Sequence, residues 1–218
     1  VSAETVTPFT LPPSRIIRWA RGRILDAQTT YRDEQEFRGM VLTVLSSLQE
    51  VLDATGSQTS LWDVEREKSR VIGHRPKRET DCQAWVRGQL FNLASAKNLE
   101  IAYEATIGSG SLDALITGVV EGGRLVHACV EFKLAHSTDL EHGIDVQLPE
   151  YMRRKACDFG IYFVFDFRCE RFKEPEIANL SSHLLLRPRR TPEAVRVIVL
   201  NCGYQVPPSK MRDPFEDS

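Results

Sequence analysis

Residues 125–134 read LVHACVEFKL, a dense run of apolar residues interrupted by two charges. Successive side chains of a strand point to opposite faces of the sheet. The apolar face of this strand is then Ala128, Val130, Phe132 and Leu134. Glu131 and Lys133 share the opposite face, two residues apart. The pattern therefore predicts a strand that carries a carboxylate and an ammonium group on one face.

Two turn signals come before this strand and predict a meander of three strands. Gly108-Ser109-Gly110-Ser111 separates strands expected at 99–107 and 112–120, and Glu121-Gly122-Gly123-Arg124 leads into the strand at 125–134. Glycine supplies the positive φ angles that such turns require. Helical spacing of apolar residues predicts a helix over 79–97 before the meander and another over 146–157 after it. A strand at 160–167, a helix at 174–186 and a strand at 195–200 follow.

The N-terminal part has a different pattern. Apolar residues recur at three- and four-residue steps between 14 and 55, which predicts amphipathic helix. The charged stretch 65–78 contains Gly73 and Pro76 and is interpreted as a connector. We therefore expect an N-terminal helical extension over 1–70, a main domain over 71–206, and a polar tail over 207–218.

Composition limits the class of protein. The chain has 218 residues, 42% hydrophobic and 27% charged, with a formal net charge of −2. This balance is typical of a globular domain and argues against coating nucleic acid by bulk charge. No run approaches the roughly 18 apolar residues of a membrane span. Five scattered cysteines without a CxxC pair argue against a disulfide framework, and without a signal peptide we expect a cytoplasmic protein.

Asp113 is the acid that we expect closest to the strand at 125–134. It follows the first turn, in an otherwise apolar run, and antiparallel pairing through the second turn brings it near Glu131 or Lys133. Two carboxylates supply the oxygen ligands that Mg²⁺ prefers. A bound cation polarises a phosphate and lowers the pKa of water, and a neighbouring lysine can position that water. The three residues therefore predict a site for phosphodiester chemistry.

The arrangement Asp113…Glu131-Phe132-Lys133 resembles the PD-(D/E)XK nuclease superfamily. The predicted order of elements is similar to that superfamily's αβββαβ core, so the resemblance implies an α/β, restriction-endonuclease-like fold with a mixed central sheet. It covers about residues 79–167. Glu79, at the start of the first core helix, matches an additional acidic site position. Gln147 and Tyr151 are similar to the QxxxY motif of one large subgroup, with the helix starting around 145–147 because of Pro149.

The resemblance implies a Mg²⁺-dependent nuclease in which Mn²⁺ substitutes for Mg²⁺. Asp113, Glu131, Glu79 and the backbone carbonyl of Phe132 would hold the metal, and Lys133 would position the attacking water. Gln147 and Tyr151 would contact the scissile phosphate or hold Lys133. DNA is a more probable substrate than RNA among such nucleases, and many act in bacterial antiviral defence or DNA repair. A larger polypeptide and a homodimer both stay open.

Several alternatives remain at the level of sequence. Glu131 and Lys133 could form a solvated face of an edge strand, and Glu104 competes with Glu79 as the additional acid. His127 and Cys129 share the face of Glu131, but no second Cys/His pair is spaced to complete a zinc site. Basic residues at 15–23, 153–155 and 187–190 could contact phosphates or be solvated helix faces. The rival function is a catalytically inactive module that binds nucleic acid or a protein partner.

Overall fold

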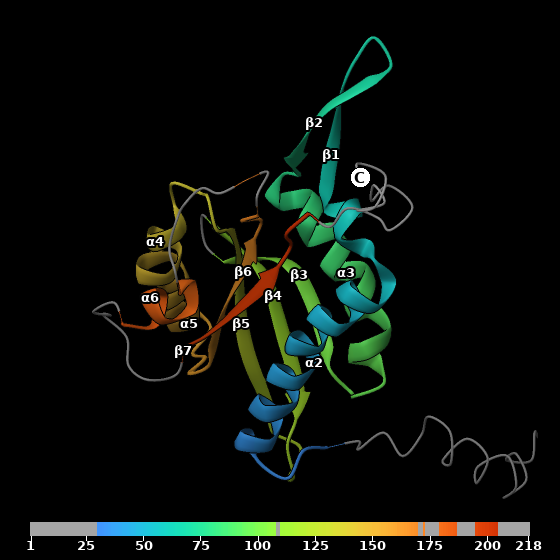
Figure 1. Cartoon of the computed structure of the whole chain (residues 1–218). Helices are drawn as coiled ribbons and strands as arrows, with labels where there is room; N and C mark the ends of the chain where they lie inside the picture. Colours follow the sequence, from blue (N-terminus) through green and yellow to red (C-terminus); the bar gives the residue numbers. More distant parts are fainter. Residues whose placement is uncertain (1–29, 108–109, 170–171, 173–178, 187–194, 205–218) are drawn as a thin grey trace, which may run out of the picture.

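The structure is a computed structural model that describes residues 30–107, 110–169, 172, 179–186 and 195–204, without the side chains of 104–107, 110 and 111. Within these residues the central sheet has five strands in the order β3-β4-β5-β6-β7 (Figure 1). The strands are β3 (Glu100–Ile107), β4 (Gly110–Val119), β5 (Leu125–Leu134), β6 (Gly160–Asp166) and β7 (Val195–Asn201). The expected strands are therefore present with bounds within a few residues.

The sheet is mixed. Strands β3, β4 and β5 form the antiparallel meander, whereas β5, β6 and β7 run parallel to one another. The register pairs Ala114 of β4 with Val130 of β5, and Phe132 of β5 with Phe163 of β6. The expected α/β class with a mixed central sheet is confirmed, and β5 lies at its centre.

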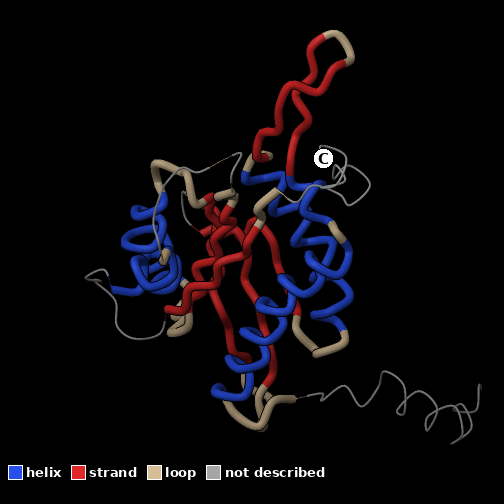
Figure 2. The backbone as a smooth tube through the Cα atoms, in the orientation of Figure 1, coloured by secondary structure: helices blue, strands red, loops and turns tan. Residues whose placement is uncertain are grey.

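Helices cover both faces of the sheet (Figure 2). The first core lies between the sheet and two helices, α2 (Glu34–Thr55) and α3 (Glu79–Ser95). The second core lies on the other face, under α4 (Leu140–His142), α5 (Leu148–Arg154) and α6 (Leu180–Leu186). In the part of the chain that the structure describes, no helix is both long and apolar enough to cross a membrane.

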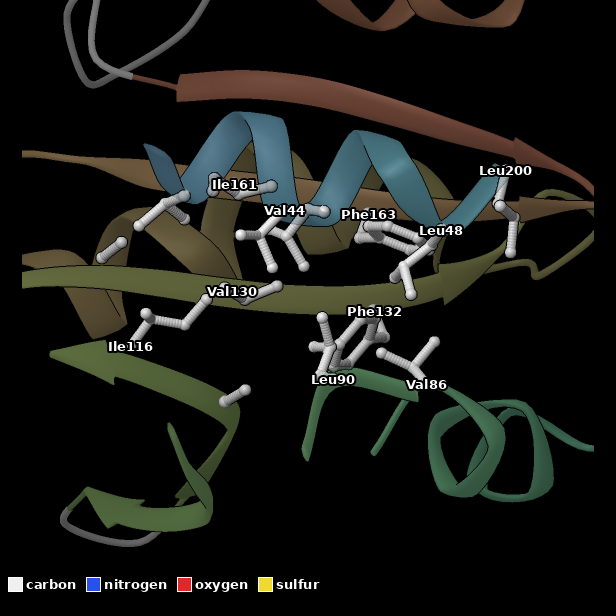
Figure 3. Close-up of a cluster of buried hydrophobic side chains, with 14 of the residues drawn as sticks. Val44, Leu48, Val86, Leu90, Ile116, Val130, Phe132, Ile161, Phe163 and Leu200 are labelled. Carbon is white, nitrogen blue, oxygen red and sulfur yellow. The ribbon is translucent and has the colours of Figure 1, made fainter. Parts of the chain in front are cut away.

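Helix α2 forms where the apolar spacing predicts it, over its described length. Asp33 caps its N-terminus by accepting a hydrogen bond from the backbone N–H of Glu36 at 2.8 Å. Gly56, with φ of 61°, ends it in the left-handed conformation that glycine adopts without strain. Val44 and Leu48 of α2 meet Val130, Phe163 and other side chains of the sheet in the first core (Figure 3).

The interpretation of 65–78 as a connector is wrong. The chain forms a hairpin of β1 (Trp62–Glu67) and β2 (Arg70–Pro76) that projects beyond the central sheet (Figure 1). Its turn uses Lys68 and Ser69, both at positive φ, instead of the glycine-containing pairs that usually signal a hairpin. At the base of the hairpin, the Trp62 Nε1–H donates to the carbonyl of Cys202 at 2.9 Å.

The predicted start of the second core helix is also wrong. Helical backbone begins at Leu140 and passes through a π-helical segment, Gly143–Gln147, before α5 starts at Leu148. The apolar residues Leu140, Ile144, Leu148 and Met152 recur at four-residue steps and are buried. Burial of this stripe favours helix across the whole stretch. Pro149 lies in the first turn of α5, directly after the π-helical segment, and has no N–H to donate back into that segment.

The predicted division near residue 70 falls in the hairpin turn. Helix α2 packs in the same hydrophobic cluster as α3 and the sheet. The basic clusters at 15–23 and 187–190, the start of the helix at 174–186, and the tail from 207 lie outside the described residues.

We expect Leu48→Ala to destabilise the whole sheet, because Leu48 is fully buried between α2 and the strands. The free energy of unfolding should fall by about 2–5 kcal/mol. Urea denaturation followed by tryptophan fluorescence measures this, with the exposed neighbour Glu50→Ala as the control. An unchanged transition in Leu48→Ala would show that α2 folds independently of the sheet.

Candidate active site

Glu131 and Lys133 lie on the face of β5 opposite the Phe132 ring, as the alternation predicts. The residue Glu131 is only 3% exposed. Its Oε1 accepts a hydrogen bond from the Lys133 Nζ at 3.3 Å. Its Oε2 is buried and has no hydrogen-bond partner among the described residues. A buried carboxylate oxygen without a partner is energetically unfavourable. This oxygen is therefore available to carry a proton or to bind a positively charged group.

Asp113 reaches the same region from β4. Continuing the β4–β5 register by one residue places Asp113 opposite Glu131. Its Oδ2 accepts the backbone N–H of Phe132 at 2.8 Å. Ala114 packs in the first core and Leu112 in the second, although strict alternation would put both on one face. The strand is thus irregular at Asp113, and the carboxylate turns toward the backbone of β5.

Glu79 comes from a third element, the first turn of α3. Its Oε2 accepts the backbone N–H of Leu134 at 3.3 Å, and its Oε1 lies 3.5 Å from the Lys133 Nζ. Both contacts hold the N-terminus of α3 against the C-terminal end of β5. The alternative acid, Glu104, lies on β3, and its side chain is outside the described part of the structure.

The structure therefore brings Glu79, Asp113, Glu131 and Lys133 into one cluster from α3, β4 and β5. Three carboxylates surround one ammonium group in this cluster. Burial, followed by the charge of Asp113, raises the pKa of Glu131 to about 8. Burial is also the main cause that raises the pKa of Asp113 and of Glu79. The acidic groups therefore resist ionisation mainly because they are buried.

The pKa of Lys133 is shifted so that its charged form is favoured, unlike the pKa values of the three acids. Its side chain is only 12% exposed, and burial alone would lower its pKa. The charges of Glu131, Glu79 and Asp113 together outweigh burial and raise the pKa. Lys133 is consequently an ammonium group that donates hydrogen bonds, and it is unsuited to act as a general base near neutral pH.

Gln147 and Tyr151 lie on the second-core side of the cluster. Gln147 ends the π-helical segment, and its Oε1 is buried without a hydrogen-bond partner in the described structure. Tyr151 lies one turn later in α5. Burial raises the pKa of Tyr151, and the charges of Glu131 and Asp113 raise it further. Tyr151 is therefore within electrostatic reach of the cluster.

Sequence reasoning missed Gln83. This residue is 5% exposed on α3, and its Nε2 donates to Asp113 Oδ1 at 3.1 Å. It lies four residues after Glu79 and so on the same helix face. The four-residue spacing from Glu79 could have indicated Gln83. An uncharged amide is a weak candidate, however, until the packing of α3 against β4 is known.

The donor set fits a hard divalent cation. The described residues contain no group of three or more His, Cys, Asp or Glu side chains arranged to hold a metal ion unaided. Mg²⁺ needs fewer than three protein carboxylates, since it commonly binds through one or two and keeps several waters. Asp113 and Glu131 supply two carboxylates, the backbone carbonyl of Phe132 is the predicted third ligand, and Glu131 Oε2 is the oxygen that lacks a partner.

A family model described as "Domain of unknown function (DUF8371)" matches residues 37–169, which is more than half of the chain. The chain belongs to this family. The DUF8371 match begins in α2, includes the hairpin, and contains all six predicted site side chains. No curated protein and no solved structure matches the chain.

The raised pKa of Glu131 predicts that stability falls as pH rises. Between about 4.5 and 8 the native state retains a proton that the unfolded state has lost, so the free energy of unfolding decreases through that window. The slope from this group should reach about 1.4 kcal/mol per pH unit. Glu131→Gln should remove this slope and be the more stable form at pH 8 in EDTA.

Chemical denaturation at pH 5, 6, 7 and 8 in EDTA measures the effect. Glu50→Gln, on the exposed side of α2, is the matched control. Parallel stability profiles for wild type and Glu131→Gln would contradict the burial of an ionisable Glu131.

Proposed function

We propose that this chain is a metal-dependent nuclease of the PD-(D/E)XK type that hydrolyses phosphodiester bonds. The observation that carries the proposal is the buried, unpartnered oxygen of Glu131 beside Asp113 and Lys133. A binding partner with positive charge would relieve both the unpaired oxygen and the mutual repulsion of the acids. A divalent cation is the simplest such partner for carboxylate oxygens.

The order of elements supports the same proposal. Helix α3, the meander β3-β4-β5, helix α5 and strand β6 follow one another as the αβββαβ core requires. Asp113 and the Glu131/Lys133 pair occupy the second and third of these strands. We therefore propose a restriction-endonuclease-like core.

In this proposal, Asp113, Glu131 and the Phe132 carbonyl would hold Mg²⁺, for which Mn²⁺ can substitute, and Glu79 would orient water beside it. When bound, the cation neutralises phosphate charge and acidifies water. The Phe132 N–H and Gln83 fix the carboxylate of Asp113 before substrate arrives. Such positioning avoids reorganisation during the reaction.

Lys133 acts as a donor that orients the attacking water and stabilises developing negative charge. Water adds to phosphorus, one P–O ester bond breaks, and the products are a phosphate monoester end and a hydroxyl end. Gln147, whose amide oxygen lacks a partner, and Tyr151 contact the scissile phosphate or hold Lys133. Both assignments rest on the resemblance to the QxxxY motif.

DNA is the proposed substrate, ahead of RNA, and the proposed setting is a cytoplasmic effector of bacterial defence or DNA repair. These assignments rest on the resemblance. The rival, an inactive module with the same fold, would not need all four charged residues of the cluster. Their convergence around a single lysine favours an enzyme.

Lys133→Met and Asp113→Asn should each reduce cation-dependent cleavage by at least about a hundredfold, because they remove the water-orienting donor and a metal ligand. The assay uses linear duplex DNA, circular DNA, single-stranded DNA and RNA, each with Mg²⁺, Mn²⁺ or EDTA. Lys68→Met, at the tip of the hairpin, is the matched control and should retain wild-type cleavage.

Thermal unfolding with millimolar Mn²⁺ separates the two functions. Cation binding to the native state must raise the melting temperature of the wild type. No cleavage of any substrate and no cation-dependent shift would together reject the nuclease.

A further inference from the structure

Helix α3 carries a row of side chains that starts at Glu79 in the active-site cluster and continues toward the C-terminal end of the helix. Glu79, Gln83, Arg87 and Phe91 follow at four-residue steps, so the row winds around the helix by about 120° between Glu79 and Phe91. With a rise of 1.5 Å per residue, the row extends about 18 Å. The first two members contact the site, while Arg87 and Phe91 have no role in the chemistry described above.

A cavity of about 350 Å³ lies beside the outer half of this row. Its lining includes Arg87 and Phe91 from α3 and Glu100, Ile101 and Tyr103 from β3. Strand β3 is one of the two edge strands of the central sheet in the described part of the chain, and α3 lies beside it (Figure 1). The inner end of the cavity is close to the site, since Tyr103 pairs with Ala114, the neighbour of Asp113.

Three features of the cavity point to a flat, partly polar ligand attached to a negative charge. The Phe91 ring is 74% exposed, which is unusual for a large apolar side chain. The Tyr103 hydroxyl is buried and has no hydrogen-bond partner in the described structure. The Arg87 guanidinium lies 4.8 Å from the centre of the Tyr103 ring and interacts electrostatically with Asp113.

We propose that this cavity binds an unpaired base of a single-stranded nucleic acid segment, whose backbone then follows α3 to the Asp113/Glu131 cluster. The base stacks on Phe91, the Tyr103 hydroxyl bonds to its polar edge, and Arg87 contacts a phosphate. The inference rests on the proposed nuclease function and adds a preference for single-stranded or unpaired substrate.

The chemistry favours a single strand over a duplex. Bases in a duplex are stacked on both faces and are not available to an aromatic side chain, whereas unpaired bases stack readily on such platforms. An extended peptide pairing with the free edge of β3 is the competing occupant. The cation of Arg87, next to a site for phosphodiester chemistry, favours the nucleic acid.

Phe91→Ala tests the inference without disturbing the core, because the ring is largely exposed. Anisotropy of a labelled 12-nucleotide oligothymidine in EDTA should show at least about a tenfold loss of affinity. Phe91→Trp should retain affinity, because it restores a stacking surface. Affinity for a 12-base-pair duplex should change less than twofold. Ile72→Ala, which changes another exposed apolar residue, on the hairpin, should bind as wild type does.

A second probe reports stacking itself. Fluorescence of 2-aminopurine in the single strand should be quenched by wild type and by Phe91→Trp, and not by Phe91→Ala. If wild type cleaves nucleic acid but Phe91→Ala binds the single strand equally well, the cavity has another occupant and this inference alone is overturned. If wild type neither binds nor cleaves any nucleic acid, the nuclease proposal fails as well.

Discussion

The site depends on one unfavourable interaction, the burial of the Glu131 carboxylate beside two further acids, Asp113 and Glu79. Glu131 sits at the centre of the sheet, with 3% of its surface exposed and one oxygen unpaired. A residue in that setting is stable when protonated or when a cation is bound. The ionisation of this carboxyl and the binding of a cation are therefore linked.

The rest of the fold holds this arrangement together. The Phe132 N–H fixes Asp113, the Leu134 N–H fixes Glu79, and Gln83 holds the second oxygen of Asp113. All three donors belong to β5 or α3, which the first core presses together. The packing of Phe132 against Phe163, with ring centres 5.4 Å apart, belongs to that core and lies directly behind the charged face. Packing in the first core thus holds β5 and α3 in place, and these two elements position the charged residues of the site.

Much of this could be predicted from the sequence, because strand alternation and short turns are local. The bounds of β5 are as expected, and the meander places Asp113 opposite Glu131. The β1–β2 hairpin was not predicted, because Lys68 and Ser69 form its turn without glycine. The π-helical segment Gly143–Gln147 gave no sequence signal, since its wider hydrogen bonding follows from packing on the second core.

The roles of Gln83, Arg87 and Phe91 could not be predicted for a related reason. They follow Glu79 at four-residue steps along α3, but which way these side chains face is decided by contacts between α3 and β4, which are distant in the chain. The mixed direction of the sheet likewise depends on crossovers rather than on strand composition. Long-range packing therefore decides which side chains of α3 face the Asp113/Glu131 cluster and which lie nearer the edge of the sheet. The local sequence pattern does not show this.

The most direct test is a titration of the Glu131 side-chain carboxyl followed by ¹³C NMR, with Glu131→Gln used to assign the resonance. The account predicts a pKa of about 8 in EDTA that falls by several units when Mg²⁺ is added. A pKa near the ordinary glutamate value in EDTA, unchanged by Mg²⁺, would contradict it.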